Sequence, residues 1–148
     1  MKLQLLPAQD SDFETLLALR IRALRPSLEA LGRFDPQRAR ERFRQAFSPA
    51  RTLRIELEGS CIGLITVDRS QDPWALEQLY LDPSAQGCGI GSHLLRQLLQ
   101  EADQAQVAVR VDALRGSDAN RFYLQHGFEQ VGEGEWDIHY QRPFRLLH

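Results

Sequence analysis

The sequence predicts a mixed α/β fold in one domain, with a sheet that carries helices on both faces. Apolar residues recur at helical spacing in several segments, strand-like segments lie between them, and the strands follow one another both directly and across a helix. Strands joined by a short turn pair antiparallel, whereas a helical crossover joins parallel strands, so the sheet should contain both kinds of pair. The expected order is β-α-α-β-β-β-α-β-α-β-β, in a single domain over residues 1–148.

The composition is that of an ordinary globular protein. Hydrophobic residues make up 43% and charged residues 26% of the 148 positions, which is enough for a core that needs no disulfide. The formal net charge of −2 argues against a general nucleic-acid binder and against a protein that binds anionic membranes. The two cysteines, Cys61 and Cys88, lack metal-ligand spacing, so we expect reduced thiols, no metal site and a cytoplasmic protein. The first residues lack the apolar run of a signal peptide, and no segment approaches the roughly 20 apolar residues of a membrane span.

Two helices are expected near the N-terminus, after a short strand at 2–6. Ser11 and Glu14 have the spacing of a capping box, which predicts a helix start. The residues that then recur at helical spacing are Phe13, Leu17, Ile21, Leu24, Leu28 and Leu31. Pro26 should break or kink this helix, and Asp35 followed by Pro36 predicts the start of the second.

The remaining elements are read from alternation, turns and one long apolar stripe. Five further strands and the C-terminal hairpin arm are expected at 52–57, 61–67, 74–81, 107–111, 128–132 and 135–142. A helix after residue 89 should bury Ile90, Leu94, Leu95, Leu98, Leu99 and Ala102. A short helix at 117–126 should end at Gly127.

Three alternating glycines, Gly87, Gly89 and Gly91, stand between a strand and this long helix. Glycine allows a backbone to approach a ligand closely, and the free N–H groups of the helix start favour an anion such as phosphate. The lysine and spacing of a nucleotide P-loop are missing. A dinucleotide fingerprint is approached, with Asp112 after the next strand, but Ser92 stands where a third glycine or alanine is needed. A plain structural turn is the remaining alternative.

Two motifs in order resemble the signatures of the GNAT N-acyltransferase superfamily. Gln86–Gly91, QGCGIG, resembles the motif Q/R-x-x-G-x-G/A, and Leu79–Pro83, LYLDP, resembles the L-x-V-x-P segment before it. Ala119–Phe128 resembles the second signature, A-x-x-(F/L)-Y-x-x-x-G-F, about 30 residues further on. The resemblance covers nearly the whole chain and implies a mixed, mostly antiparallel sheet of about seven strands with a splay between the fourth and fifth.

The resemblance also implies acetyl-CoA as co-substrate, bound at that splay. The backbone amides expected to hold the pyrophosphate are those of Gly87, Cys88, Gly89, Ile90, Gly91 and Ser92. Gln86 would brace the loop. The backbone of Leu79, Tyr80 and Leu81 would pair with the pantetheine arm as an added strand does and could stabilise the oxyanion. The family often has an asparagine where this sequence has Gly116, which puts one cofactor contact in doubt.

Two residues are expected to carry the chemistry. Tyr123 matches the family tyrosine near the sulfur and would act as general acid for the leaving thiolate; the alternative is a buried tyrosine that packs a helix. Glu77 lies in an otherwise apolar strand and would take the proton of the amine; the alternative is a solvent-facing glutamate. His139 is a second candidate for the base, because histidine titrates near neutral pH, although a solvent-facing strand residue is the more ordinary explanation. A covalent role for Cys88 is not expected.

The sequence leaves the acceptor open. We expect an N-acetyltransferase that acts on a primary amine of a small molecule or peptide by direct attack; the alternative is a GNAT-like domain that binds CoA without catalysis. The first two helices hold many arginines, which form either a solvated face or a site for an acidic acceptor: Arg20, Arg22, Arg25, Arg33, Arg38, Arg40, Arg42 and Arg44. A homodimer is possible if the terminal strand, 136–140, pairs across two copies.

Overall fold

The computed structural model of the chain describes residues 2–146. Its seven strands form one sheet in the order β1-β2-β3-β4-β5-β7-β6, mostly antiparallel with a parallel pair between β4 and β5. This confirms the expected fold class and element order. The chain divides into two compact units, Met1–Thr66 with Gln78–Cys88 and Val67–Glu77 with Gly89–His148, and each is described by itself.

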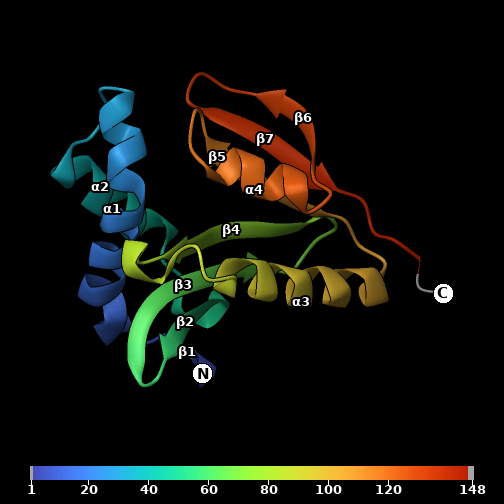
Figure 1. Cartoon of the computed structure of the whole chain (residues 1–148), viewed down its shortest axis with the longest axis horizontal. Helices are drawn as coiled ribbons and strands as arrows, with labels where there is room; N and C mark the ends of the chain where they lie inside the picture. Colours follow the sequence, from blue (N-terminus) through green and yellow to red (C-terminus); the bar gives the residue numbers. More distant parts are fainter. Residues whose placement is uncertain (1, 147–148) are drawn as a thin grey trace. The chain divides into compact units, whose positions relative to one another are not determined.

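The first unit contains the N-terminal strands and helices. Its elements are β1 (Leu3–Pro7), α1 (Phe13–Ala30), α2 (Pro36–Ala46), β2 (Thr52–Leu57), most of β3 (Ser60–Asp68) and the second half of β4 (Trp74–Leu81). The helices α1 and α2 lie side by side (Figure 1). Between them the ring of Phe43 stacks on those of Phe13 and Phe47 with centroid separations of 5.3 and 5.2 Å. Leu16 and Leu64 are fully buried in the same core.

The start of α1 differs from the prediction. A 3₁₀ turn at Asp10–Asp12 precedes the helix, and the Asp12 carboxylate accepts a hydrogen bond of 2.8 Å from the backbone N–H of Gln9. The reciprocal cap is therefore formed by Gln9 and Asp12, and the proposed capping box of Ser11 and Glu14 is wrong. Glu14 instead accepts two hydrogen bonds from the Arg40 guanidinium on α2, at 2.7 and 2.8 Å. The capping carboxylate is thus Asp12, three residues after the cap residue Gln9.

Pro26 does not end α1, which continues to Ala30. A proline in a helix removes one backbone hydrogen bond, and here the helix continues for four residues beyond it. Arg25 forms an ion pair with Glu29 one turn later, and its guanidinium lies 4.5 Å from the ring centroid of Phe34. The second helix start is as predicted: the Asp35 carboxylate accepts from the N–H groups of Gln37 and Arg38, with Pro36 in the first turn.

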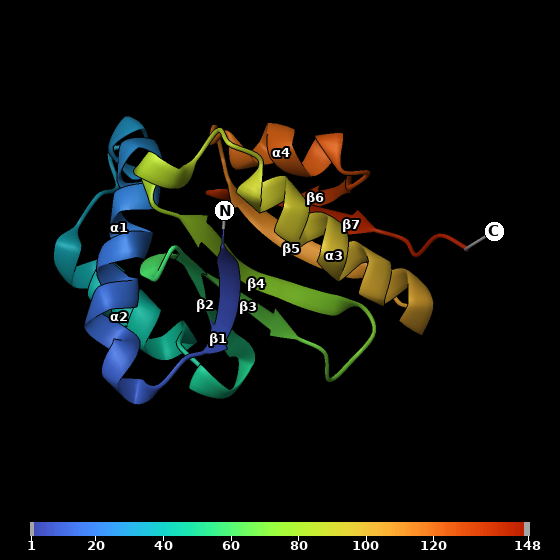
Figure 2. The same cartoon turned by 60° about the horizontal axis from the view of Figure 1, so that its bottom comes forward.

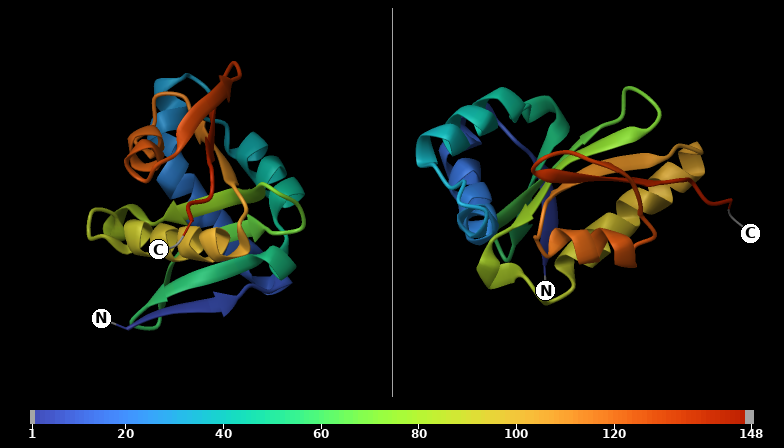
Figure 3. Two further views of the ribbon diagram at one scale, coloured as in Figure 1. Left: turned by 90° about the vertical axis from the view of Figure 1, so that its right-hand side faces the viewer. Right: turned by 90° about the horizontal axis from the view of Figure 1, so that it is seen from above.

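The second unit contains the C-terminal half of the sheet with two helices. Its elements are the first half of β4, α3 (Ile90–Ala105), β5 (Val109–Leu114), α4 (Ala119–Gln125), β6 (Glu129–Glu133) and β7 (Asp137–Arg142). The predicted stripe of α3 is confirmed, since Ile90, Leu94, Leu95, Leu98, Leu99 and Ala102 are all buried. The helices α3 and α4 belong to the same face of the β5–β7 pair, because Asp103 of α3 binds Arg142 and Asn120 of α4 binds Tyr140 (Figure 2 and Figure 3).

The strand β5 begins two residues later than predicted, because the end of α3 uses the residues before it. Gln106 takes the left-handed conformation with φ of 57°, and the N–H of Val107 bonds to the carbonyl of Ala102. This is the usual way in which a helix satisfies its last carbonyl groups. Val107 therefore closes the helix instead of opening the strand.

The parallel pair β4–β5 is joined only where both strands begin. Trp74 is opposite Val109 and Ala75 opposite Arg110, and among the described residues the parallel register consists of these two pairs. In contrast, β7 pairs with β5 over the whole of Val109–Leu114. Within the second unit, one edge of β5 is therefore without a strand partner beyond Arg110, as a splay requires.

The strand β7 is not a free edge. It pairs with β5 on one side and with β6 on the other, so it has no open backbone with which to pair across two copies. The expectation of a dimer built on 136–140 is therefore corrected: the terminal strand of the sheet at this end is β6. Among the described residues, no helix combines the length and the apolar character needed to cross a bilayer.

Candidate functional site

The glycine loop is anchored at its first residues. The Asp82 carboxylate accepts hydrogen bonds from the N–H and the hydroxyl of Ser84 and binds Arg22 of α1 at 2.6 Å. These bonds from Ser84 first, and then from Arg22, hold the pKa of Asp82 below its usual value. Gln86 Nε2 donates to the carbonyl of Leu81 at 3.0 Å, which ties the loop back to the end of β4.

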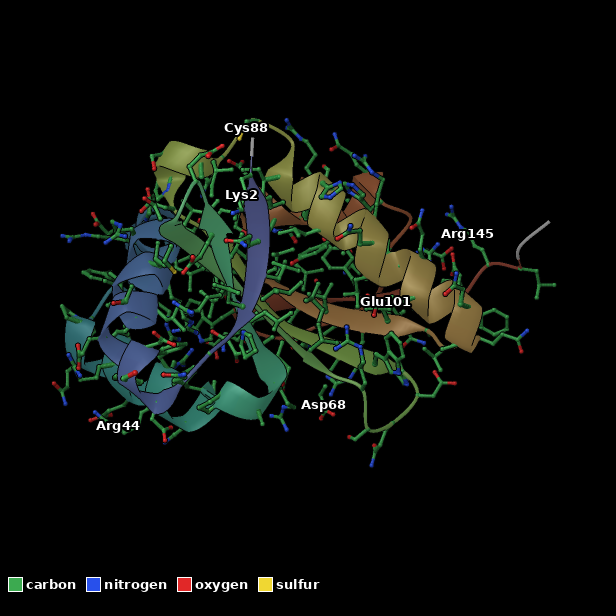
Figure 4. All side chains as sticks on the ribbon, turned by 90° about the horizontal axis from the view of Figure 1, so that it is seen from below. Lys2, Arg44, Asp68, Cys88, Glu101 and Arg145 are labelled. Atoms are coloured by element: carbon green, nitrogen blue, oxygen red, sulfur yellow. The ribbon has the colours of Figure 1, made fainter. Side chains whose placement is uncertain are left out.

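The loop then turns through two left-handed glycines. Gly87 and Gly89 have φ of 80° and 86°, and a Cβ at either position would have no neighbour within 4 Å. Crowding around the loop therefore does not require glycine here, whereas the backbone conformation does. Cys88 between them is exposed and lies in the loop that leads into α3 (Figure 4).

The start of α3 has the properties of an anion site. Gly89 is the N-cap and provides no side-chain cap, and the first turn carries no acidic residue. In the described part of the chain, no acceptor lies against the backbone N–H groups of residues 87–92, whereas that of His93 bonds to Gly89. Unpaired N–H groups at the positive end of a helix suit a phosphate group. The residues present thus fit a pyrophosphate.

The strand β4 has one edge toward β3 and one edge away from it, and its backbone N–H and C=O groups point to one or the other. A Cβ at Gly63 would lie 2.3 Å from the carbonyl oxygen of Tyr80, and the N–H of Asp82 bonds to Ile62, so residues 80 and 82 point their polar groups at β3. Backbone groups alternate along a strand, so those of Leu79 and Leu81 point the other way. The prediction that the backbone of Leu79, Tyr80 and Leu81 pairs with a pantetheine arm stays a prediction. Of the three, Leu79 and Leu81 suit that role best, because the Tyr80 carbonyl oxygen lies toward Gly63 of β3.

Tyr123 is buried in an aromatic cluster of the second unit. Its side chain is 5% exposed, and its ring lies 5.3 Å from those of Phe122 and Phe128 and 6.4 Å from that of Tyr140 between centroids. Packing of a helix on a sheet, the alternative considered from the sequence, is thus a real role of this residue.

Asn120 braces the turn between β5 and α4. Its Nδ2 donates to the carbonyls of Leu114 and Ser117, and its Oδ1 accepts from the hydroxyl of Tyr140. Asn120 therefore does not replace the family asparagine, whose place is taken by Gly116 with φ of 82°. The turn at this point is held from inside the protein.

The structure pairs His139 with a carboxylate that sequence analysis did not associate with it. His139 Nδ1 lies 2.6 Å from Oδ1 of Asp112, across the strands β5 and β7. The register of β5 and β7 decides this contact between His139 and Asp112, which are 27 positions apart in the chain, and no local sequence signal carries that information.

Glu77, the other candidate for the base, is exposed on β4.

The arginines of α1 and α2 have separate partners. Arg22 binds Asp82, Arg25 binds Glu29 and Arg40 binds Glu14. Arg20 lies between the rings of Phe43 and Tyr80, 5.8 and 5.7 Å from their centroids. These four of the eight arginines are therefore engaged by side chains of the first unit itself, and the choice between a solvated face and a site for an acidic acceptor stays open. In the described residues no group of three or more His, Cys, Asp or Glu side chains is placed to hold a metal ion.

A family model, described as the acetyltransferase (GNAT) domain, matches residues 48–130, more than half of the chain. The chain belongs to the GNAT acetyltransferase family. The match includes β4, the glycine loop, α3 and Tyr123, so the P-loop and dinucleotide alternatives for the loop are wrong. No curated protein matches the sequence of this GNAT domain.

Solved structures share the fold of this GNAT domain over nearly its whole length. The PaiA N-acetyltransferase of Thermoplasma acidophilum, in complex with coenzyme A, has 17% identity and a TM-score of 0.78, with 97% of this chain and 100% of that chain covered. An acetyltransferase of Thermus thermophilus has 21% identity and a TM-score of 0.71, with 97% and 98% covered. The ribosomal-protein-S18-alanine N-acetyltransferase of Escherichia coli has 15% identity and a TM-score of 0.67, with 99% and 97% covered. Identities this low show the fold alone.

Proposed function

We propose that this GNAT domain is an N-acetyltransferase that moves the acetyl group of acetyl-CoA to a primary amine of a small molecule or peptide. The observation that supports it most is the glycine loop, where successive N–H groups without partners meet the start of α3. The family match and the coenzyme A complex of a structural neighbour favour CoA as the ligand of these groups. The residues proposed to hold the pyrophosphate are Gly87, Cys88, Gly89, Ile90, Gly91 and Ser92.

The backbone of β4 is proposed to hold the arm of the cofactor. The polar groups of Leu79 and Leu81 point away from β3, so their N–H groups are available to the pantetheine amides or to the thioester oxygen. A donor that is already oriented toward a developing oxyanion lowers the barrier to acyl transfer. Gln86 supports this arrangement from behind through its bond to the Leu81 carbonyl.

Tyr123 is proposed as the general acid. When the tetrahedral intermediate collapses, the electron pair of the carbon–sulfur bond goes to sulfur, and a phenol can donate a proton to the resulting thiolate. Glu77 is one candidate for the base that removes the proton of the attacking amine. Direct attack needs no covalent intermediate on the protein, so Cys88 has no part in the chemistry beyond its backbone N–H.

Thiol release from acetyl-CoA against a panel of amines tests this function. We expect turnover with one class of amine, and a loss of about 10²-fold in kcat for Tyr123→Phe with unchanged acetyl-CoA affinity. Tyr140→Phe is the matched control: it removes another buried hydroxyl of the second unit, one that bonds to Asn120, and should lower stability without lowering turnover.

Two results would contradict parts of the proposal. Turnover that Tyr123→Phe leaves unchanged would remove the tyrosine from the mechanism and retain the enzyme. Tight binding of acetyl-CoA with no thiol release for any amine class would favour a CoA-binding domain without catalysis, the alternative considered from the sequence.

A further inference from the structure

The exposed face of β5 and β7 carries a histidine–carboxylate pair. Burial alternates along both strands, so that Val111 and Tyr140 are buried while Asp112 and His139 lie on the opposite face. The two residues are direct partners in the antiparallel register, and His139 Nδ1 lies 2.6 Å from Asp112 Oδ1. An ionised carboxylate can only accept a hydrogen bond, so the hydrogen is on Nδ1 and, in the neutral ring, the lone pair is on Nε2.

The second nitrogen of His139 is left accessible. Its side chain is 43% exposed, and among the described residues Nε2 has no hydrogen-bond partner. Two glycines flank the ring: a Cβ would lie 3.5 Å from Cδ2 at Gly132 and 3.7 Å from Nε2 at Gly134. Neither glycine has the left-handed conformation, so the backbone does not require glycine at these positions. Their effect is that no neighbouring side chain covers Nε2 from this direction.

The pair lies beside the open edge of β5. Pairing with β4 is recorded at Val109 and Arg110, and Asp112 comes two residues later, where the β4 side of the strand has no partner among the described residues. Tyr123 packs against Tyr140, whose side chain is on the buried face of β7. Within the second unit, Tyr123 and His139 therefore lie on opposite faces of the same strand pair.

We propose that His139 is the general base that takes the proton of the acceptor amine, and that Asp112 is the positioning residue that fixes its tautomer. This inference rests on the proposed acetyl transfer and deepens it, since it assigns the base to His139 instead of Glu77. The neutral amine nitrogen forms a bond to the thioester carbon, and its proton passes to Nε2. The carbon–sulfur bond then breaks, its electron pair goes to sulfur, and the thiolate takes a proton from Tyr123. Solvent later removes the proton from His139 and returns one to the tyrosine.

Other charged side chains lie on the strands next to the His139–Asp112 pair. On the same face, β5 contributes Arg110 opposite Gln141, and β6 contributes Glu129, also opposite Gln141. Glu133, near the end of β6, is paired with Arg115 at 3.4 Å, and Asp137 is two residues away on β7. Asp112 is the charged group in direct contact with the ring, so its removal should change the tautomer of His139 more than the removal of any of the others.

The test compares wild type, His139→Gln and Asp112→Asn, with Gln141→Ala as a control on the same face of β7. We expect His139→Gln to lose about 10²-fold in kcat and to lose the fall of kcat/KM toward acidic pH that a protonated base causes. Asp112→Asn places an amide where a carboxylate accepts, which favours hydrogen on Nε2, and should lower kcat at least about tenfold. Gln141→Ala should retain activity, and all variants should bind acetyl-CoA as wild type does.

The outcomes separate this inference from the function on which it rests. If wild type acetylates an amine and His139→Gln retains both its kcat and its acidic limb, the assignment is overturned. If Glu77→Gln instead abolishes that limb, the base is Glu77. If wild type binds acetyl-CoA but acetylates no amine, the proposed function fails and the role of His139 fails with it.

A second measurement reports on the pair without activity. Long-range ¹H–¹⁵N correlation of the His139 ring should show hydrogen on Nδ1 in the neutral wild-type protein and a shift toward the Nε2–H tautomer in Asp112→Asn. Hydrogen on Nε2 in the wild type would contradict the proposal, because the lone pair would then face the carboxylate.

Discussion

Gly89 links the loop to α3, and its backbone has the left-handed conformation, which is unfavourable for residues other than glycine. Its φ is 86°, and nothing within 4 Å would meet a Cβ, so Gly89→Ala adds backbone strain and no clash. We expect a loss of about 1–2 kcal/mol in the free energy of unfolding. We also expect weaker acetyl-CoA binding, because relief of the strain would change the backbone of the loop whose N–H groups are proposed to bind the pyrophosphate.

Gly59 offers a matched control for this prediction. It has nearly the same conformation, with φ of 81°, also without a neighbour within 4 Å, but lies in the turn between β2 and β3. Urea unfolding and calorimetric titration of both variants should show similar losses of stability, and a loss of acetyl-CoA affinity in Gly89→Ala alone. Equal affinities for the two variants would mean that the loop conformation does not matter for the cofactor.

At the scale of single residues, sequence reasoning found those that act through the backbone or through a local motif. Gly87, Gly89 and the cap residue Asp35 are read directly from their neighbours. It did not find the partner of His139, because the contact depends on the register of β5 and β7. Next to that pair, the register of β6 on β7 shifts at a bulge between Gln130 and Gly132, which no residue pattern announces.

At the scale of elements, apolar periodicity predicted the helices well and their ends less well. The apolar stripe of α3 is buried as expected, because six apolar residues at helical spacing define a single face of the helix that can pack on the core. The start of α1 and the start of β5 were misplaced, since each depends on which of several polar groups captures a terminal N–H or carbonyl. Pro26 was expected to break or kink α1, and the helix in fact continues past it to Ala30.

The link between α3 and β7 should be sensitive to acid. Arg142 donates to both oxygens of Asp103, at 2.8 and 3.1 Å, and the two side chains are 5% and 10% exposed. The hydrogen bonds from Arg142 lower the pKa of Asp103, so its stabilising effect is complete above the unfolded pKa and is lost as pH falls through the folded one. Asp103→Asn leaves the buried guanidinium without its counter-charge and should cost about 3–5 kcal/mol near neutral pH.

Urea unfolding as a function of pH checks this prediction. The difference between wild type and Asp103→Asn should be largest near neutrality and shrink below about pH 4, where the unfolded carboxyl takes up its proton. Glu101 is also on α3 and forms an exposed ion pair with Arg69 (Figure 4). Glu101→Gln should lower the free energy of unfolding by no more than about 1 kcal/mol. A difference that stays constant with pH would assign the loss to packing instead of charge.

At the scale of the whole molecule, the division into two units falls inside the glycine loop. Gly87 and Cys88 belong to the first unit and Gly89–Ser92 to the second. A ligand held by these amides binds only a chain in which the loop and the start of α3 are folded. A ligand that binds only the native state stabilises it by about 2.7 kcal/mol at 100 times its dissociation constant. Acetyl-CoA should therefore raise the melting temperature and slow the exchange of core amides in both units.

Hydrogen exchange with and without acetyl-CoA distinguishes this linkage from local protection of the loop. We expect slower exchange at Leu16 and Leu64 in the first unit and at Val111 in the second, because each is buried in its own core and exchanges only when that core opens. NAD at the same concentration should leave both unchanged, since it lacks the pantetheine arm that β4 is proposed to hold. Protection confined to residues 86–93 would show that binding does not depend on the integrity of either core. Protection by NAD would show that the pantetheine contacts do not determine which ligand binds.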